Sequence, residues 1–533
     1  LAGFSGDVYA HTGVITSESS DGSDWKYVKT GWGENTEETH LENIGTDLYE
    51  LEISPSIRDY YGVPDGEEIL FMAFVFRNAD GTVTGRDEDG GDIFVTVYQP
   101  GLNLTVSLED ESGIFGIGDE ISVSAEVTPV GTTDAEFIGL YLDGQELATG
   151  SGNTLNETLI ADETGTHWLK AVANNEDYET ADSVSFFVYG QITEEDLPAG
   201  IHDGINNIDE NSVTLVLHAP YKETVFLIGD FNNWELSNDY LMKRTTDGER
   251  YWLTLEGLNA GQEYIFQYLV DGNIRIADPY CDKVSDPWND QYISEDIYPG
   301  LIDYPDDKTS GIAGVFQTAQ EEYNWEVTGF TPPAVEDMVI YELLVRDFTE
   351  NRDIKTVMDS LDYLENLGVN VIELMPVNEF EGNNSWGYNP SFYFAPDKAY
   401  GTKNDYKKFI DECHKRGIAV FIDMVLNHSF SQSPLVRLYF NESSYQVTEE
   451  NPWYNVDCPH SNWCWGYDFD HEAEVVKDFV DSVNSYWLTE YKVDGFRFDF
   501  TKGFTNNTDP DGWNYDASRV AILKRMADEI WNV

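Results

Sequence analysis

The sequence predicts a multidomain protein in which β-sandwich modules precede a parallel α/β region. Up to about residue 303, short runs of alternating hydrophobicity are separated by turn signals such as Asp80-Gly81 and Asp143-Gly144, a pattern typical of sandwiches. After residue 337, strand and helix patterns alternate instead, which predicts parallel strands joined by right-handed crossovers. The length of 533 residues is enough for three to five domains of about 100–200 residues each.

Turn and breaker signals divide the chain into modules. A first break falls at Gln99-Pro100-Gly101 and a second near residues 190–204, where Leu197-Pro198-Ala199-Gly200 interrupts the pattern. We therefore predict β-sandwich modules over residues 1–98, 101–190 and 203–303. A linker rich in Pro and Asp over 304–336 then leads into the α/β region, 337–533.

Four strand–helix units are predicted in the α/β region. Asp353 and Asn404 are the expected N-caps of its first two helices, and Gly368 and Gly417 the expected stops. The last helix begins near Asp516. A long loop, 429–471, is expected to form a small subdomain of its own. The four strands are expected at residues 339–345, 369–375, 418–425 and 493–500.

Charge and aromatic content restrict the kind of partner. The chain has 99 acidic and 30 basic residues, a formal net charge of -69, which repels nucleic acid and anionic membranes. Solubility is the simplest reason for that charge. It also contains 14 Trp and 32 Tyr, whose flat rings suit sugars. Because the sequence has no run of 18 apolar residues, we expect no membrane insertion.

The cysteines are too few for a disulfide scaffold. Cys458 and Cys464 bracket a short loop and are close enough in sequence to form one bridge. Cys281 and Cys413 are expected to be unpaired, with Cys413 on the apolar face of a helix.

Polar side chains gather at the ends of two predicted strands, where parallel α/β proteins place their chemistry. The segment Asp423-Met-Val-Leu-Asn427-His428 ends one strand, and Arg497 and Asp499 end the next. Since Arg497 and Asp499 are two residues apart, they point to the same face of the sheet. A carboxylate beside a guanidinium has its ionised form favoured, which suits a nucleophile.

These segments, with Leu374-Met375-Pro376 and Trp386-Gly387-Tyr388-Asn389-Pro390, resemble glycoside hydrolase family 13, the α-amylase family. The resemblance implies that residues 337–533 are the first half of a (β/α)8 TIM barrel, truncated after the fourth βα unit. It also implies that Asp499 is the catalytic nucleophile and that Arg497 holds it ionised and oriented. The implied substrate-binding residues are Tyr388, which stacks on a sugar ring, His428, which contacts its hydroxyls, Lys502, on the leaving-group side, and Asp423, which supports the site.

The sequence departs from the family pattern at two points. Many α-amylases bind calcium through residues at the positions of Asn427 and Asp468 and a His after the Lys, but here that position is Gly503, so calcium stays open. Retaining glycosidases also need a second carboxyl group as acid/base. The family places it after the fifth strand, so we expect it beyond residue 533, in a longer polypeptide, and expect the chain alone to be inactive.

The front modules also resemble carbohydrate-binding folds. Residues 203–303 resemble carbohydrate-binding-module family 48, in which Trp234 is a candidate glucan-binding ring. The first module is distantly similar to the starch-binding modules of bacterial amylases, with Trp25 and Trp32 as candidate sugar platforms. The second module shows only an immunoglobulin-like pattern and is read as a spacer.

Together these features predict an enzyme that cleaves α-1,4-glucosidic bonds of starch or glycogen by a retaining mechanism. Two alternatives stay open: a branching or pullulanase-like debranching enzyme of the same family, and a non-catalytic glucan-binding protein. Because polymeric starch does not cross membranes, we expect an extracellular, cell-surface or periplasmic location.

Overall fold

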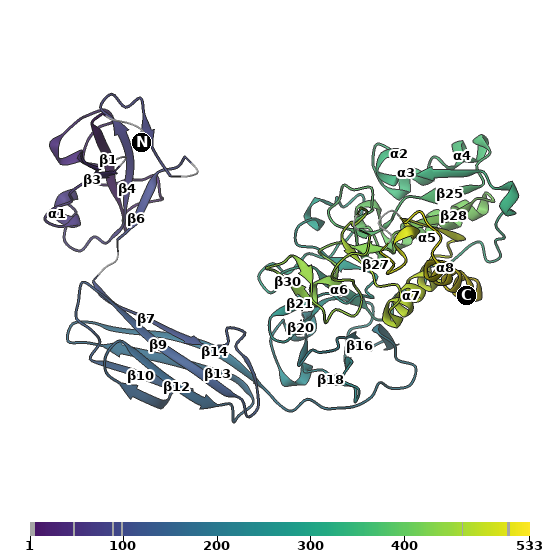
Figure 1. Cartoon of the computed structure of the whole chain (residues 1–533), viewed down its shortest axis with the longest axis horizontal. Helices are drawn as coiled ribbons and strands as arrows, with labels where there is room; N and C mark the ends of the chain where they lie inside the picture. The colour runs from purple at the N-terminus through teal and green to yellow at the C-terminus, as the bar shows by residue number, and fades with distance from the viewer. Residues whose placement is uncertain (1–5, 46–47, 88–89, 98–99, 461, 509–511) are drawn as a thin grey trace. The chain divides into compact units, whose positions relative to one another are not determined.

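The computed structural model describes residues 6–45, 48–87, 90–97, 100–460, 462–508 and 512–533. The chain divides into two compact units. One comprises 1–111, 120–160 and 167–186, and the other comprises 112–119, 161–166 and 187–533 (Figure 1). In the described part of the chain, no helix has both the length and the apolar character needed to cross a membrane.

The N-terminal part of the first unit is one twisted sheet with the order β3-β2-β1-β4-β5, in which β6 also pairs with β4. One face packs on α1 (Ile57–Tyr61) because Val14 of β1 and Ile69 of β4 meet Tyr60 and Tyr61 of the helix. The strands are β1 (Val8–Thr16), β2 (His40–Gly45), β3 (Leu48–Glu50), β4 (Ile69–Asn78), β5 (Thr84–Gly85) and β6 (Ile93–Thr96).

Two antiparallel sheets follow, with the orders β11-β10-β13-β14 and β12-β9-β7. Alternate residues are buried along their strands, as the sandwich pattern predicts. In the second unit, β8 (Ile114–Gly116) pairs in parallel with the last residues of β14. The other strands are β7 (Gly101–Leu108), β9 (Glu120–Val130), β10 (Phe137–Leu142), β11 (Gln145–Gly150), β12 (Thr154–Ile160), β13 (Gly165–Asn174) and β14 (Glu179–Tyr189).

The next module has sheets of order β15-β16-β19-β18 and β17-β20-β23-β22, with β21 paired to β20. Its predicted end at residue 303 is wrong, because β23 lies inside the expected linker and pairs with β20. The strands are β15 (Gly204–Asp209), β16 (Ser212–His218), β17 (Val225–Gly229), β18 (Lys243–Arg244), β19 (Arg250–Leu255), β20 (Glu263–Val270), β21 (Ile274–Ile276), β22 (Val284–Ser285) and β23 (Ala313–Gln317).

The α/β region contains the parallel sheet β24-β25-β28-β33, so the predicted parallel pairing is confirmed. The observed strands are shorter than predicted, and residues after Leu344 already form a short helix, α2. The strands are β24 (Ile340–Leu343), β25 (Val371–Leu374), β28 (Ala419–Met424) and β33 (Gly495–Phe498).

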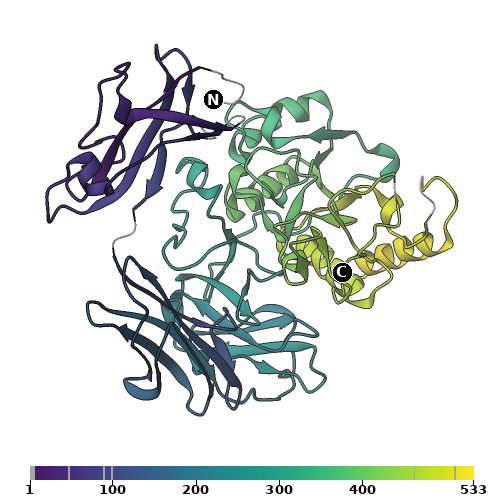
Figure 2. The same cartoon turned by 60° about the vertical axis from the view of Figure 1, so that its left-hand side comes forward.

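Most helix ends in this region lie at the capping residues expected from the sequence. Asp353 caps α3 and Gly368 ends α4, as predicted, and α8 begins beside Asp516, the predicted start, which caps it. Asn404 is not a cap, because Thr402 forms a reciprocal capping box with Asp405. The helix expected over 353–367 is broken into α3 and α4. The bounds are α2 (Val345–Phe348), α3 (Ile354–Met358), α4 (Leu361–Leu367), α5 (Lys403–Lys415), α7 (Glu474–Glu490) and α8 (Ala517–Asn532); α8 is the yellow helix of Figure 2.

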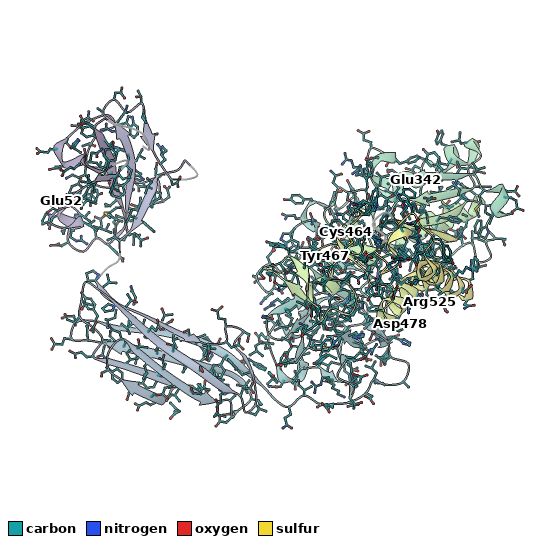
Figure 3. All side chains as sticks on the ribbon, in the orientation of Figure 1. Glu52, Glu342, Cys464, Tyr467, Asp478 and Arg525 are labelled. Carbon is teal, nitrogen blue, oxygen red and sulfur yellow. A yellow bond between two sulfur atoms is a disulfide. The ribbon has the colours of Figure 1, made fainter. Side chains whose placement is uncertain are left out.

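Two loops extend beyond the sheet. The first, after β25, is a hairpin of β26 (Asn378–Phe380) and β27 (Pro390–Pro396). The second, 429–471, carries the predicted disulfide Cys458–Cys464; Cys464 and Tyr467 of this loop are labelled in Figure 3. Cys281 and Cys413 are free and buried, as expected. The elements of the second loop are β29 (His428–Ser429), α6 (Pro434–Arg437), β30 (Phe440–Asn441), β31 (Gln446–Val447) and β32 (Tyr467–Asp468).

Candidate active site

Asp423 and Arg497 are paired neighbours on the parallel strands β28 and β33. Asp499 follows directly after β33, and its backbone N–H donates to the carbonyl of Met424 at 3.0 Å. The backbone therefore brings all three side chains to the carboxyl end of the sheet, as the sequence predicts.

The guanidinium of Arg497 connects the two carboxylates. Its Nη1 donates to Oδ1 of Asp423 at 2.8 Å and to Oδ1 of Asp499 at 2.6 Å. The Asp423 side chain is fully buried, whereas 21% of the Asp499 side chain and 43% of Arg497 are exposed. Asp423 thus binds the Arg497 guanidinium on its buried side, and Asp499 is the more accessible of the two carboxylates.

Tyr388 completes the buried side of this group. Its hydroxyl donates to Oδ2 of Asp423 at 2.7 Å, so both Asp423 oxygens have donors. Burial raises the pKa of Asp423 to about 6, against the opposing effects of Tyr388 and Arg497. Burial and the neighbouring Asp423 also raise the pKa of Tyr388 well above its usual value. Tyr388 therefore positions Asp423. The sequence predicted that Tyr388 stacks on a sugar ring, but it did not predict this hydrogen bond.

His428 is a buried ring held on both sides. Its Nε2 lies 2.9 Å from the carbonyl oxygen of Tyr388, and its Nδ1 lies 2.9 Å from the Asn427 side-chain amide. Burial lowers the pKa of His428, so the ring is neutral near pH 7. Both ring nitrogens face oxygens, Nδ1 that of the Asn427 side chain and Nε2 that of the Tyr388 backbone, so the ring is held in one orientation.

Asn427 and Asp468, the predicted calcium ligands, lie side by side in the fold. His428 pairs with Asp468 between β29 and β32, and the N–H of Phe469 donates to the Asn427 carbonyl at 3.0 Å. The Asp468 carboxylate accepts from Asn455 at 2.9 Å, and burial raises its pKa to about 7. Asp468 therefore offers a buried carboxylate close to Asn427 in the fold, and carboxylate and amide oxygens are the ligand types that a hard cation takes.

Lys502 lies against tryptophan rings. Its Nζ is 3.1 Å from the ring centre of Trp513 and 5.9 Å from that of Trp463. The structure therefore gives the ammonium a cation–π environment, which the sequence did not predict.

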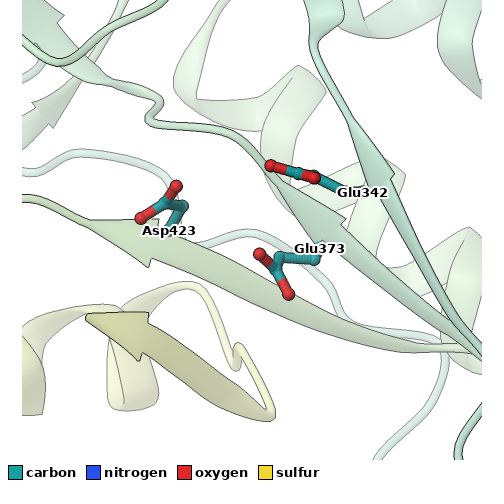
Figure 4. Close-up of side chains that lie close together, drawn as sticks. All are labelled: Glu342, Glu373 and Asp423. Atoms are coloured by element: carbon teal, nitrogen blue, oxygen red, sulfur yellow. The ribbon is translucent and has the colours of Figure 1, made fainter. Parts of the chain in front are cut away.

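Two glutamates near Asp423 were missed in the sequence. Glu342 of β24, Glu373 of β25 and Asp423 have carboxylate oxygens within 4.8 Å of one another, and the three side chains turn toward one space (Figure 4). Burial and the charge of Glu342 raise the pKa of Glu373, while Arg497 lowers it. Each Glu is a single carboxylate inside a largely apolar strand sequence, and that is the signal by which it could have been found.

The front-module tryptophans lie in different surroundings. In the first module a row of rings crosses the sheet face opposite α1, with centroids successively 5.2, 5.7, 6.4 and 6.2 Å apart, formed by Trp32, His11, Trp25, Phe94 and Phe71. Trp32 is 51% exposed. Trp234 instead packs against two hydrophobic clusters, and its indole N–H donates to Asp230 at 3.1 Å.

Comparison with known proteins identifies the class to which this site belongs. The family described as alpha amylase, catalytic domain, matches residues 346–465, which include Tyr388, Asp423 and His428. The resemblance to the α-amylase family is thereby confirmed for this segment, and Arg497, Asp499 and Lys502 follow it in the chain.

The relatives of this chain are named for different enzyme activities. Malto-oligosyltrehalose trehalohydrolase of Saccharolobus solfataricus is 29% identical over 308 residues, 56% of this chain and 46% of that protein. The 1,4-alpha-glucan branching enzyme GlgB of Bacillus subtilis is 27% identical, covering 58% and 47%. Chloroplastic isoamylase 1 of Arabidopsis thaliana is 33% identical, covering 45% and 35%. The chain thus spans about half the length or less of these relatives.

Among solved structures, a putative alpha amylase from Salmonella typhimurium is 25% identical with a TM-score of 0.46, covering 62% of this chain and 47% of that one. The Group B Streptococcus pullulanase SAP in complex with maltotetraose is 18% identical with a TM-score of 0.45, covering 80% and 56%.

Proposed function

We propose that this chain carries the nucleophile half of a retaining glycosidase site that cleaves α-1,4-glucosidic bonds of starch or glycogen. The observation that carries the proposal is the bridge from Arg497 Nη1 to both Asp423 and Asp499. It fixes an accessible carboxylate at the end of a parallel strand, within a chain whose catalytic region belongs to the α-amylase type.

In the proposed reaction, Asp499 attacks the anomeric carbon of the glucosyl unit. The bond from that carbon to the bridging oxygen breaks, and its electron pair leaves with the oxygen, which takes a proton from an acid. A water molecule then attacks the anomeric carbon and gives a proton to the conjugate base of that acid, and the bond from the carbon to Asp499 breaks with its electron pair on the carboxylate. The work of Arg497, Asp423 and Tyr388 is to hold the nucleophile in position throughout.

Glucan branching or debranching is the second candidate of the same family. The relatives named branching enzyme and isoamylase favour it. A branching enzyme passes the glucosyl group from the nucleophile to a sugar hydroxyl rather than to water. Product analysis distinguishes the three: new reducing ends from amylose indicate α-1,4 hydrolysis, new α-1,6 branches indicate transfer, and linear chains released from amylopectin with amylose left intact indicate debranching.

A non-catalytic glucan-binding protein is the remaining alternative. Binding to amylose without covalent labelling of Asp499 by an activated glycosyl donor would support it. Labelling at Asp499 would support the enzyme.

We also propose that the ring row containing Trp25 and Trp32 binds starch, because exposed rings offer flat apolar faces to glucose units. We do not extend this to Trp234, whose ring is engaged in packing. Trp25→Ala with Trp32→Ala is expected to reduce adsorption to insoluble starch, whereas an unchanged adsorption with a lower Tm would assign them to the core.

Two further properties are proposed. A calcium ion held by Asn427 and Asp468 would neutralise a buried charge and brace the loop 429–471 beside His428. An extracellular, cell-surface or periplasmic location is supported by the disulfide Cys458–Cys464, because such bonds persist in oxidising compartments. Detection of the protein in the culture medium or the periplasm tests the proposed location.

A further inference from the structure

Two exposed tryptophans at the end of the loop closed by Cys458–Cys464 lie against Phe500, the neighbour of the candidate nucleophile in the chain. Trp463 is 37% exposed and Trp465 is 46% exposed. The ring centre of Trp465 lies 4.9 Å from that of Phe500, the residue that follows Asp499. Trp463 lies 5.7 Å from Trp465 and 6.4 Å from Phe500. The three rings therefore form one cluster around the residue that follows Asp499 in the chain, and we call this cluster the ledge.

A second contact ties the ledge to the other side of the site. Gly466 has φ +57 and passes so close to β29 that an added Cβ would lie 2.3 Å from the carbonyl oxygen of Ser429 and 3.2 Å from Cδ2 of His428. Because only glycine fits this position, the backbone next to Trp465 is fixed against the strand that carries His428.

The loop is also anchored where it meets the segment after β33. His460 is buried, and its Nε2 lies 3.1 Å from the carbonyl oxygen of Thr505. Asn455 donates to both Asp468 and Asn506. With the disulfide, these contacts hold Trp463 and Trp465 in place while their faces stay open to solvent.

Exposed rings on such a braced loop point to a ligand that stacks. The chain carries a formal net charge of -69, which disfavours an anionic ligand. Polar rings with apolar faces, such as glucose units, are neutral and stack on indole. Lys502, which lies over Trp463 and Trp513, offers N–H donors to sugar hydroxyls at the same place.

We propose that Trp463 and Trp465 are specificity-determining residues that stack on the α-glucan chain on the Lys502 side of the bond attacked by Asp499. This inference rests on the proposed function, and it adds the residues that hold the chain beside that bond. The disulfide and Gly466 act as positioning elements for the two rings.

Binding of maltoheptaose, measured by calorimetry, tests the ledge. The 533-residue chain is used with Trp25→Ala and Trp32→Ala as background, so that the front module does not contribute. Trp465→Ala and Trp463→Ala are each expected to weaken binding about tenfold, the loss of one stacked ring. Trp465→Phe is expected to recover part of the loss. Trp531→Ala, which removes an 81% exposed ring on α8, is the matched control and should bind like the background.

Removal of the disulfide provides a second, independent test of the ledge. Cys458→Ser with Cys464→Ser removes the closure but no ring, and is expected to weaken binding at least threefold with both tryptophans present. Melting temperatures of all variants within a few degrees of the background exclude unfolding as the cause.

The outcomes separate the two proposals. If the background chain binds no maltoheptaose and Asp499 takes no glycosyl label, the proposed function fails. If the background binds maltoheptaose and Trp465→Ala binds it equally well, the ledge is wrong and the proposed function stands.

Discussion

Arg497 and Asp499 are joined by a 2.6 Å hydrogen bond from Nη1, and the same nitrogen holds buried Asp423 at 2.8 Å. One planar group therefore sets the position of the candidate nucleophile relative to the sheet. Lysine carries the charge but lacks the rigid fork of donors, so charge and geometry can be tested separately.

Arg497→Lys is expected to lower the rate at which an activated maltosyl fluoride labels Asp499 by about 100-fold, the usual cost of losing a positioned donor. The melting temperature should stay within a few degrees of the parent. A labelling rate within about threefold of the parent would show that Arg497 contributes charge alone.

The labelling rate is expected to fall as the pH drops through about 6. Asp423 has its pKa raised to about 6 by burial, so below that pH it takes up a proton and loses its charged interaction with Arg497. Tyr388→Phe removes a donor that lowers this pKa, so the midpoint should move to higher pH. Labelling profiles between pH 4.5 and 8, if identical for both proteins, would contradict the role of Tyr388.

Asp278 makes folding of the second unit depend on pH. It is fully buried, accepts from Tyr268 Oη at 2.6 Å and from the Tyr280 N–H at 2.7 Å, and burial raises its pKa to about 7. The folded state thus binds more protons than the unfolded state between about pH 4 and 7, so stability from this group is complete below pH 4 and is lost as pH rises to 7.

The measurement for Asp278 is urea unfolding at pH 5 and pH 8. Its contribution across the window is at most about 4 kcal/mol, from about three units of pKa at about 1.4 kcal/mol each. Asp278→Asn should reduce the difference between the two pH values, at a cost of about 1–3 kcal/mol at pH 5 from the lost acceptor. An unchanged difference would place the pH dependence elsewhere.

Gly466→Ala is expected to disturb the ledge and His428 together. The added methyl group meets the Ser429 carbonyl at 2.3 Å in a backbone conformation that disfavours alanine. The variant should lower both maltoheptaose affinity and the labelling rate. Gly382→Ala, also at positive φ but with nothing within 4 Å of its added Cβ, is the control for backbone strain alone, and equal effects would refute the contact argument.

Calcium is expected to raise the melting temperature of the protein by several degrees over the value in chelator, because the ion binds the folded state. Asp468→Asn should remove that increment. An increment that survives Asp468→Asn would assign the ion to other ligands.

The sequence was sufficient for the features set by local rules. Asp353, Gly368 and Asp516 mark helix ends because capping needs only neighbouring residues. Asp423, Arg497 and Asp499 meet because parallel strands end at one edge of the sheet.

Long-range contacts were beyond its reach. The strand β23 pairs with β20 across some fifty positions, so it read as linker. The choice of Thr402 over Asn404 is a local exception, because Thr402 and Asp405 bond reciprocally and this pair was overlooked in the sequence. Glu342 and Glu373 come together only because their strands are neighbours in the sheet. The ledge forms only because the loop before β32 folds back onto Phe500.

Asp499 as the nucleophile is tested by trapping the glycosyl group on it. A maltosyl fluoride with a second fluorine on the reacting ring supplies a leaving group that needs no acid and forms an intermediate that turns over slowly. We predict that mass spectrometry of the digested protein finds one glycosyl group on the peptide containing Asp499, and none after Asp499→Asn. A label on another carboxylate, or an equal label in the Asp499→Asn protein, would contradict the account.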